Sequence, residues 1–313
     1  MGHEHRQSCA SAMRHNGIRS SSRGLVVRLL LVAIFCTQAS GMAIGAPQRR
    51  HQEISVKGAT QHPCRRQLLR LVFTATTIAN LGLDNLPCNA LSPEQASSDY
   101  DSYAPQYDQL DGGEVSSLLG LDQSRAQLCR KARGRVLEIG VGTGLNLDKY
   151  DSASVSSLTL VDISDGMIRE ARARVDALNL DFPIDFVRAD ATTELLSVFG
   201  RDRFDTVVDS FSLCVMGNDG AKDCLKQVAQ VVKCQKDGGQ ILLLENTRSS
   251  NSFLGMYQDI TASTAATAGG KGCVYNQDVG AMIRDIHDIQ LVQETPFVSG
   301  LFRSFECVKV CTS

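Results

Sequence analysis

A glycine-dense turn between two strand-like segments constrains the fold of this chain more than any other feature. An apolar strand pattern opens at Val136 and runs into a turn that holds Gly140, Gly142 and Gly144. A second strand pattern, Leu158–Val161, ends at the carboxylate of Asp162. Glycines let a backbone approach a ligand closely, and an acid at the tip of the next parallel strand can accept hydrogen bonds from ribose hydroxyls. The pattern predicts a nucleotide-type ligand at the carboxyl ends of two neighbouring parallel strands.

The spacing and charge of this turn favour a cationic ligand over a phosphate. Its glycines follow G-x-G-x-G, whereas dinucleotide-binding turns follow G-x-G-x-x-G. Glu138 lies near the end of the first strand, where its charge would oppose a pyrophosphate, and no lysine follows the glycines as in a P-loop. S-adenosylmethionine carries a sulfonium, an ammonium and no phosphate. We therefore expect S-adenosylmethionine as the cofactor, with NAD as the alternative.

These segments resemble motifs I and II of the class I S-adenosylmethionine-dependent methyltransferases. The resemblance covers about residues 100–312 and continues, in family order, through Val187–Ala191, Phe204–Asp209 and Gly238–Glu245. Upstream, Tyr100–Asp108 is similar to the segment that precedes the core of the ubiquinone/menaquinone-type enzymes. The segments that resemble the methyltransferase-like proteins of the fungal mitochondrial inner membrane and their plant organellar relatives are Asp209–Cys214, Leu244–Ser249 and Gly272–Asp278.

The resemblance implies an enzyme that moves the methyl group of S-adenosylmethionine to a small or lipid-soluble acceptor, quinone-like or a thiol. Such a transfer is an in-line displacement, for which the protein supplies orientation and desolvation. Two alternatives stay open: a membrane-tethered assembly or scaffold protein that retains the fold, and an NAD-dependent oxidoreductase.

Strand and helix patterns alternate from Arg135 onward, which predicts an α/β fold with a Rossmann-like, doubly wound, mostly parallel sheet. Helical spacing of apolar residues marks Asp165–Leu178, with Ser164 as its N-cap, and Asp219–Lys233. The last stretch, around Pro296 and Gly300, predicts an antiparallel C-terminal hairpin. The class I methyltransferase sheet, with seven strands and one reversed near the edge, is similar. The remaining strand patterns are Arg135–Ile139, Ile184–Arg188, Thr206–Val208 and Gln240–Glu245.

Each candidate donor-site residue receives a role. Asp162 is expected to hold the ribose hydroxyls, and Asp190 with Ala191 to face the adenine amine. Glu138 would orient the glycine loop and the cationic methionine end. Met167 would pack on the adenine, and Tyr107 would close over the donor. The alternatives are a helix-capping or loop role for the aspartates, a buried ion pair for Glu138, and simple core packing for Met167 and Tyr107.

The acceptor side is expected in the loops after the fourth and fifth strands. Asp209 is the candidate catalytic base, because a carboxylate there can take the proton of a hydroxyl, thiol or activated carbon acid. Helix capping is its alternative role. No nucleophile motif is present, and residues 91–313 contain one histidine, His287, for which a surface position is expected. The further candidates are Ser210, Glu245, Asn246 and Arg248.

Charge divides the chain into a basic leader and an acidic body. Residues 1–90 hold 11 Lys and Arg against 3 Asp and Glu, and residues 91–313 hold 21 against 31. An acidic body lacks the clustered cations that phosphate contacts need, so no nucleic-acid partner is expected. We expect a targeting leader over 1–90, a helical lid over 91–134 and the S-adenosylmethionine-binding domain over 135–313.

The leader combines a signal-like segment (19–41), a transit-like segment (48–64) and a twin-arginine-like or membrane-anchor segment (65–90). This series predicts a plastid protein associated with thylakoids, with the mitochondrion and its inner membrane as the alternative. The anchor interpretation implies membrane association through the N-terminal segment.

The cysteines of the body predict neither a metal site nor a disulfide framework. Seven of the 11 cysteines lie there, scattered and never as C-x-x-C, which suits small buried apolar residues. Unpaired thiols favour a reducing compartment, which conflicts with a twin-arginine export signal. They are Cys129, Cys214, Cys224, Cys234, Cys273, Cys307 and Cys311.

Overall fold

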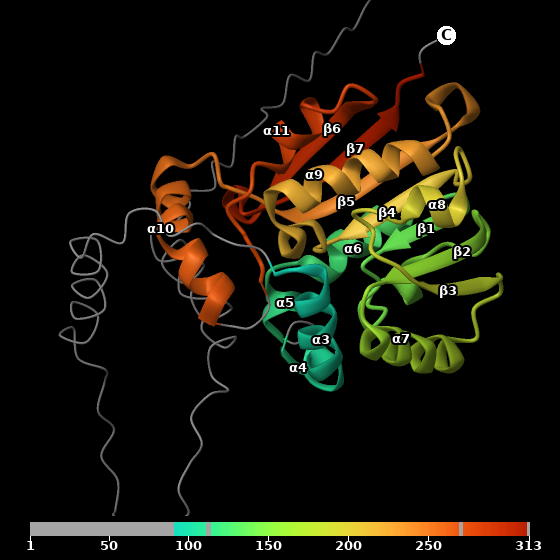
Figure 1. The fold of residues 1–313 in the computed structure, drawn as a ribbon, viewed down its shortest axis with the longest axis horizontal. Helices are drawn as coiled ribbons and strands as arrows, with labels where there is room; N and C mark the ends of the chain where they lie inside the picture. Colours follow the sequence, from blue (N-terminus) through green and yellow to red (C-terminus); the bar gives the residue numbers. More distant parts are fainter. Residues whose placement is uncertain (1–90, 111–113, 269–271, 312–313) are drawn as a thin grey trace, which may run out of the picture.

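Seven strands form one sheet in the computed structural model, which describes residues 91–110, 114–268 and 272–311 (Figure 1). The order across the sheet is β3-β2-β1-β4-β5-β7-β6. Strands β1 to β5 are parallel, and β7 is antiparallel to both of its neighbours. The doubly wound, mostly parallel sheet with its C-terminal hairpin is therefore confirmed. The strands are β1 (Gly134–Ile139), β2 (Val155–Asp162), β3 (Ile184–Arg188), β4 (Thr206–Ser210), β5 (Gln240–Asn246), β6 (Ile289–Phe297) and β7 (Phe302–Lys309).

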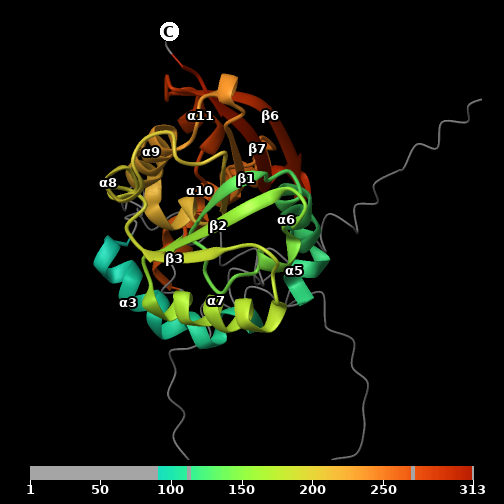
Figure 2. The same ribbon diagram turned by 90° about the vertical axis from the view of Figure 1, so that its right-hand side faces the viewer.

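Two apolar clusters pack against the opposite faces of this sheet, and helices cover both faces (Figure 2). Neighbouring strand residues alternate between the clusters, as the pleat requires: Leu137 belongs to one cluster and Val136 to the other. Helices α8 (Leu195–Phe199), α9 (Leu213–Val231) and α11 (Val279–Arg284) contribute to the first cluster. Helices α6 (Leu121–Cys129) and α7 (Asp165–Leu178) contribute to the second.

Helix α7 matches its predicted bounds, and the hydroxyl of Ser164 accepts a hydrogen bond from the Met167 backbone N–H at 3.0 Å as the N-cap. Helix α9 begins six residues before the predicted Asp219. Its extra first turn precedes Gly217, where a positive φ of 70° interrupts the helix. That first turn places side chains over the carboxyl end of β4.

The N-terminal described residues form short helices, of which α3 packs beside α7 (Figures 1 and 2). They are α3 (Pro93–Tyr103), α4 (Tyr107–Leu110) and α5 (Glu114–Leu118). The predicted leader, residues 1–90, lies outside the described residues. Within the described ranges, no helix is long and apolar enough to cross a membrane.

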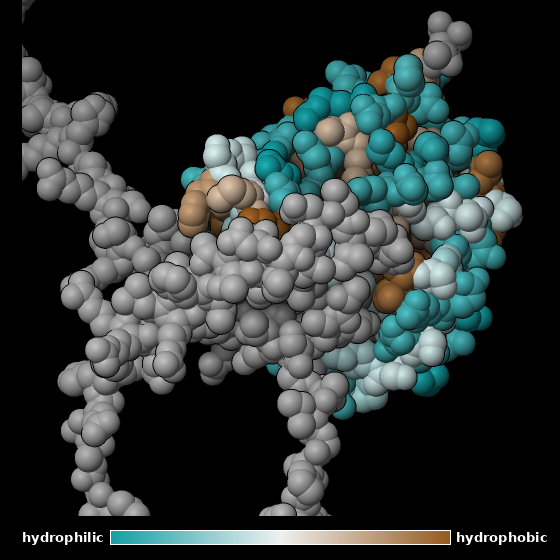
Figure 3. Space-filling view, turned by 60° about the vertical axis from the view of Figure 1, so that its left-hand side comes forward, coloured by the Kyte–Doolittle hydropathy of each residue, from teal (hydrophilic) through white to brown (hydrophobic). Residues whose placement is uncertain are grey.

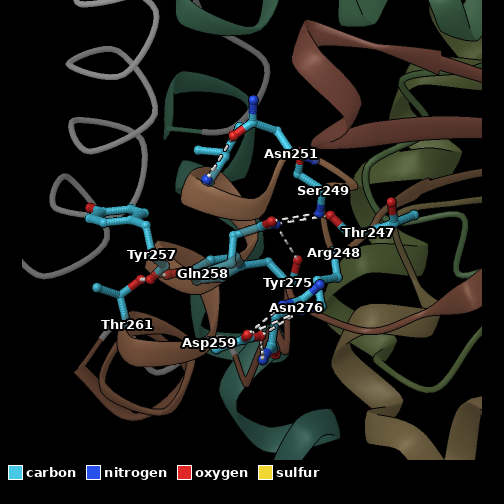
Figure 4. Close-up of polar contacts among 11 residues, drawn as sticks. Thr247, Arg248, Ser249, Asn251, Tyr257, Gln258, Asp259, Thr261, Tyr275 and Asn276 are labelled. Carbon is cyan, nitrogen blue, oxygen red and sulfur yellow. Dashed lines mark hydrogen bonds and ion pairs between the residues drawn. The ribbon is translucent and has the colours of Figure 1, made fainter.

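Helix α10 (Ser252–Ala268) follows β5. Its buried residues include Leu254, Ala262 and Ala266, and its Gln258 and Asp259 bind the backbone and side chains of two neighbouring loops (Figure 4). On its outer face, Phe253, Met256 and Ile260 are exposed. They are three and four residues apart and so lie along one side of the helix. Most of the described surface on this side is hydrophilic (Figure 3).

The cysteine prediction is wrong for one pair. Cys234, after α9, forms a disulfide with Cys311, beyond the end of β7. Strand β7 brings the two cysteines together, because its Lys309 forms an isolated β-bridge with Cys234. Sequence spacing did not reveal this pair, because 77 residues separate its members. Four other cysteines are buried thiols, as expected: Cys129, Cys214, Cys224 and Cys307.

Candidate functional site

A cavity of about 330 Å³ opens at the carboxyl ends of β1, β2, β3 and β4. Ligands of open α/β sheets bind at this edge, where the strand order reverses. We refer to it as the main cavity. Its walls come from α3 and α4, from the loops after these strands and from the first turn of α9. Among the lining residues are Leu91, Pro93, Ala96, Tyr100, Tyr107, Gly140, Gly142, Asp162, Met167, Asp190, Ala191, Ser210, Phe211, Ser212, Val215 and Met216.

The glycine loop after β1 forms one wall of the main cavity. Gly140 and Gly142 both have positive φ, 59° and 56°. A Cβ on Gly140 would collide with the side chain of Ser212, whereas a Cβ on Gly142 would meet nothing closer than 4.0 Å. Gly140 therefore permits close packing, and Gly142 is required by its backbone conformation.

Asp162 holds this loop in place. Its Oδ2 accepts a hydrogen bond from the Gly142 N–H at 2.9 Å, and its Oδ1 accepts one from the Ser164 N–H at 2.9 Å. Burial raises the pKa of Asp162 to about 6, against these backbone hydrogen bonds, which lower it. Each carboxylate oxygen retains a lone pair that can accept a hydrogen bond from a ligand hydroxyl.

Four further predicted donor-site residues line the same cavity: Met167, Asp190, Ala191 and Tyr107. Asp190 is held by Thr192, whose backbone N–H and hydroxyl donate to its Oδ1 at 2.8 and 2.7 Å. The structure thus brings together residues from three strand ends and from the N-terminal helices.

Two predicted donor-site residues do not line the main cavity. Gly144 packs against Leu147, where a side chain would collide. Glu138 is fully buried, and its two carboxylate oxygens accept hydrogen bonds from Asn146 at 2.9 Å and from the Tyr150 hydroxyl at 2.7 Å. Glu138 therefore binds the loop that follows the glycines without lining the main cavity.

Burial raises the pKa of Glu138 to about 7, although the hydrogen bonds from Tyr150 and Asn146 and the charge of Arg125 lower it. Arg125, on α6, is buried, with its guanidinium 4.8 Å from the centre of the Phe211 ring. The sequence offered no obvious basic neighbour for Glu138. In the folded chain this basic neighbour is Arg125, which lies on α6 and not in the strand segments from which the site was predicted.

Two acids of the Tyr100–Asp108 segment join the N-terminal helices to the rest of the site. Asp101 accepts hydrogen bonds from the Ser164 hydroxyl at 2.6 Å and from the Gly166 N–H at 2.7 Å. Asp108 pairs with Arg174 on α7 and accepts a hydrogen bond from the Thr143 hydroxyl. Sequence reasoning missed both acids, although the segment that contains them was singled out.

The acceptor-side wall comes from the segment after β4. Ser210, Phe211 and Ser212 line the main cavity, followed by Val215 and Met216 from the first turn of α9. Phe211 has a positive φ of 64°, a strained conformation for a residue with a side chain, as is common at functional sites. Of these five residues, only Ser210 was a candidate from the sequence.

The remaining acceptor-side candidates lie outside the main cavity. Asp209 is 1% exposed and Glu245 0%, both beneath Ser212. Arg248 pairs with Asp259 on α10, at 2.8 Å, and Asn246 contacts Cys214 and Cys273. His287 is exposed, as expected, and lies in the turn after α11.

The chain is similar to known methyltransferases. Residues 136–235 match the family model of a methyltransferase domain. The chain is 26% identical to the mitochondrial methyltransferase OMS1 of Saccharomyces cerevisiae, over 71% of this chain and 48% of that protein. It is 30% identical to a demethylmenaquinone methyltransferase of Bacteroides fragilis, over 49% of this chain and 61% of that enzyme. The chain thus spans about half the length of the yeast protein.

A solved structure has the same fold: the N-methyltransferase NodS of Bradyrhizobium japonicum in complex with S-adenosyl-L-homocysteine. Its TM-score is 0.50 at 14% identity, covering 69% of this chain and 98% of that one. At this identity the likeness concerns the fold alone. The fold, the family model over residues 136–235 and these relatives support a class I S-adenosylmethionine-dependent methyltransferase, with S-adenosylmethionine as its cofactor.

Proposed function

We propose that this protein transfers the methyl group of S-adenosylmethionine to a small or lipid-soluble acceptor by in-line displacement. The observation that carries the proposal is the main cavity, where the glycine loop and Asp162 face the apolar wall of Phe211, Val215 and Met216. Small-molecule sites are mostly apolar concavities with a few placed polar groups, and a volume of about 330 Å³ falls in their range.

The residues fit the donor. Asp162 would accept hydrogen bonds from the ribose hydroxyls, while Asp190 and Ala191 would bind the adenine with Met167 against its face. Gly140 and Gly142 leave room for the methionine portion, and Glu138 would hold the glycine loop through Asn146. When bound, the donor supplies an electrophilic methyl group on a good leaving group. Tyr107 and the helical lid, residues 91–134, would orient the reactants and exclude water.

A quinone-like ring or an alkyl thiol is the acceptor we favour. The name of the Bacteroides relative, a demethylmenaquinone methyltransferase, supports the quinone-like ring. The yeast relative is named as mitochondrial, so we propose the mitochondrion over the plastid, for which the comparisons give no support. Membrane association would come from residues 65–90.

Two other functions compete with this one, and ligand binding separates them. Calorimetric titration of the purified protein with S-adenosylmethionine, S-adenosylhomocysteine and NADH should give binding of the first two only. Binding of none of the three would support a scaffold protein, and binding of NADH alone would support an oxidoreductase.

The substitution Gly142→Val tests the loop. A valine at a φ of 56° is strained, and about 1–3 kcal/mol of local strain should displace the loop from Asp162. We expect loss of donor binding and of methyl transfer from isotopically labelled donor to extracted metabolites. Gly238→Val is the matched control, because Gly238 also has a positive φ, 84°, and open space around it, outside the main cavity. Equal loss in both variants would contradict a specific role of Gly142.

A further inference from the structure

Beneath the acceptor-side wall lies a pair of buried carboxyl groups on adjacent parallel strands. Asp209 on β4 and Glu245 on β5 are 1% and 0% exposed. Asp209 Oδ2 and Glu245 Oε2 have no other hydrogen-bond donor among the described residues. Two buried carboxyls in contact satisfy these oxygens when they share one proton.

The charges of the pair agree with one shared proton. Burial raises the pKa of Glu245 well above its usual range, and the neighbouring Asp209 raises it further. Burial also raises the pKa of Asp209, while the hydrogen bond from Glu245 lowers it. Glu245 is therefore the protonated member, and Asp209 carries the negative charge.

Ser212 connects this pair to the main cavity. It lines the cavity, and its hydroxyl donates a hydrogen bond to Asp209 Oδ1. Its backbone N–H and that of Leu213 donate to Glu245 Oε1 at 3.1 and 3.2 Å. The Ser212 oxygen can still accept a hydrogen bond from the cavity side. A continuous path thus runs from the cavity through Ser212 to the buried pair.

We propose that Ser212 and the Asp209–Glu245 pair take up the proton that the acceptor loses as it is methylated. This deepens the proposed function and rests on it. It assigns the acceptor to a class, a thiol or a hydroquinone-type ring, each of which gives up a proton. A tertiary amine has no such proton to lose, so its methylation would not depend on this path. Ser212 has three apolar neighbours in the cavity wall, Phe211, Val215 and Met216, and these side chains suit a thiol or a hydroquinone-type ring.

Atoms and charges balance in this step. A bond forms between the acceptor atom and the methyl carbon, the bond from that carbon to the sulfur breaks, and its electron pair stays on sulfur. The acceptor proton moves to the Ser212 oxygen as the Ser212 proton moves to Asp209. The buried negative charge is neutralised when the sulfonium charge disappears, so no isolated charge stays in the closed site.

Other titratable groups face the pair. Glu138 lies on β1, Cys214 and Cys224 lie on α9, and Cys273 lies in the loop before α11. The pKa of Cys214 is raised by its hydrogen bond with Cys273 and by burial, and burial raises the pKa of Cys224. Both are neutral thiols near pH 7. Glu138 titrates in that range, so it must be tested separately.

The first test needs neither donor nor acceptor. An infrared spectrum of the full chain at pH 7.5 should contain a carboxylic-acid carbonyl band that Glu245→Gln removes and Glu138→Gln retains. Absence of a band that depends on Glu245 would overturn the shared proton, with the methyltransferase assignment unaffected.

The second test measures turnover with labelled donor and three probes: thiophenol, methylhydroquinone and N,N-dimethylaniline. We expect kcat to fall about tenfold in Ser212→Ala and about 10²-fold in Asp209→Asn, with the acidic limb of the pH profile lost in both and KM for the donor retained. Ser212→Thr should restore most of kcat. The exposed Ser197→Ala is the matched control and should behave as wild type.

The outcomes are separable. Absence of donor binding to the wild-type protein would refute the proposed function itself. If the donor binds but neither the thiol nor the hydroquinone is methylated, the acceptor class is wrong. Methylation that keeps its pH profile in Ser212→Ala and Asp209→Asn would refute the proton path, as would equally fast methylation of the tertiary amine.

Discussion

Glu138 illustrates how a single buried acid links stability to pH. Its pKa rises from 4.5 to about 7 in the folded chain because burial disfavours its charge. The native state then binds a proton more tightly than the unfolded chain. Its stabilising contribution is fully present below about pH 4.5 and is lost as the pH rises through about 7. A shift of this size corresponds to about 3 kcal/mol.

We therefore predict that Glu138→Gln flattens the dependence of unfolding free energy on pH. Between pH 5 and 8 the variant should lose about 3 kcal/mol less than the wild type. Urea unfolding at several pH values measures this difference. Asp162 titrates in both proteins, and the exposed Glu170→Gln controls for removal of a carboxylate. Parallel curves for wild type and Glu138→Gln would contradict the buried-charge explanation.

At the scale of elements, one buried side chain of α10 binds two neighbouring loops. Gln258 is 2% exposed, and its amide oxygen accepts a hydrogen bond from the Ser249 N–H at 2.7 Å. Its amide nitrogen donates to the backbone oxygens of Thr247 at 2.9 Å and Tyr275 at 3.0 Å (Figure 4). Three backbone groups from two loops thus depend on this amide.

We predict that Gln258→Ala costs about 3 kcal/mol of unfolding free energy, because each buried polar group left unpaired costs about 1–3 kcal/mol. Hydrogen exchange at the Ser249 amide should accelerate together with that of α10. Gln127→Ala on the exposed face of α6 is the matched control. Unchanged exchange at Ser249 would mean that other contacts hold the helix.

At the scale of the whole molecule, the Cys234–Cys311 disulfide ties the end of the chain to the segment after α9. It closes a loop of 77 residues. A cross-link of that span lowers the entropy of the unfolded chain, a stabilisation of about 4–5 kcal/mol. Such a bond also persists best in an oxidising compartment, against the expectation drawn from unpaired thiols.

We predict that a reductant lowers the unfolding free energy of the wild type by about that amount. In Cys234→Ser the reductant should have no further effect on unfolding. Mass spectrometry after alkylation, with and without reduction, checks that these two cysteines are the ones protected. Identical unfolding of the wild type with and without reductant would contradict a stabilising disulfide.

The parallel strands and the donor edge were predictable because they depend on short-range patterns. Apolar strands, the glycine turn and Asp162 lie close together in the sequence, and the parallel sheet brings their carboxyl ends to one edge. The antiparallel hairpin was predictable from the segments joined through Pro296 and Gly300, and the family resemblance agreed with it. Helix α10 was not predicted as a helix, because its residues 261–268 are Ala, Thr and Ser only and do not continue a stripe of large apolar side chains.

The acceptor side depended on the tertiary structure. Whether Asp209 lies in the cavity or below it is decided by the first turn of α9, which brings Ser212 between the carboxylate and the open space. Arg125 beside Glu138 and the disulfide of Cys234 with Cys311 join positions far apart in the chain. By itself the sequence determined the sheet, the donor edge and the acids at its strand ends, because backbone periodicity and turn chemistry are local. Burial, pairing and proton sharing among those acids follow from contacts between distant segments, and only the folded chain decides them.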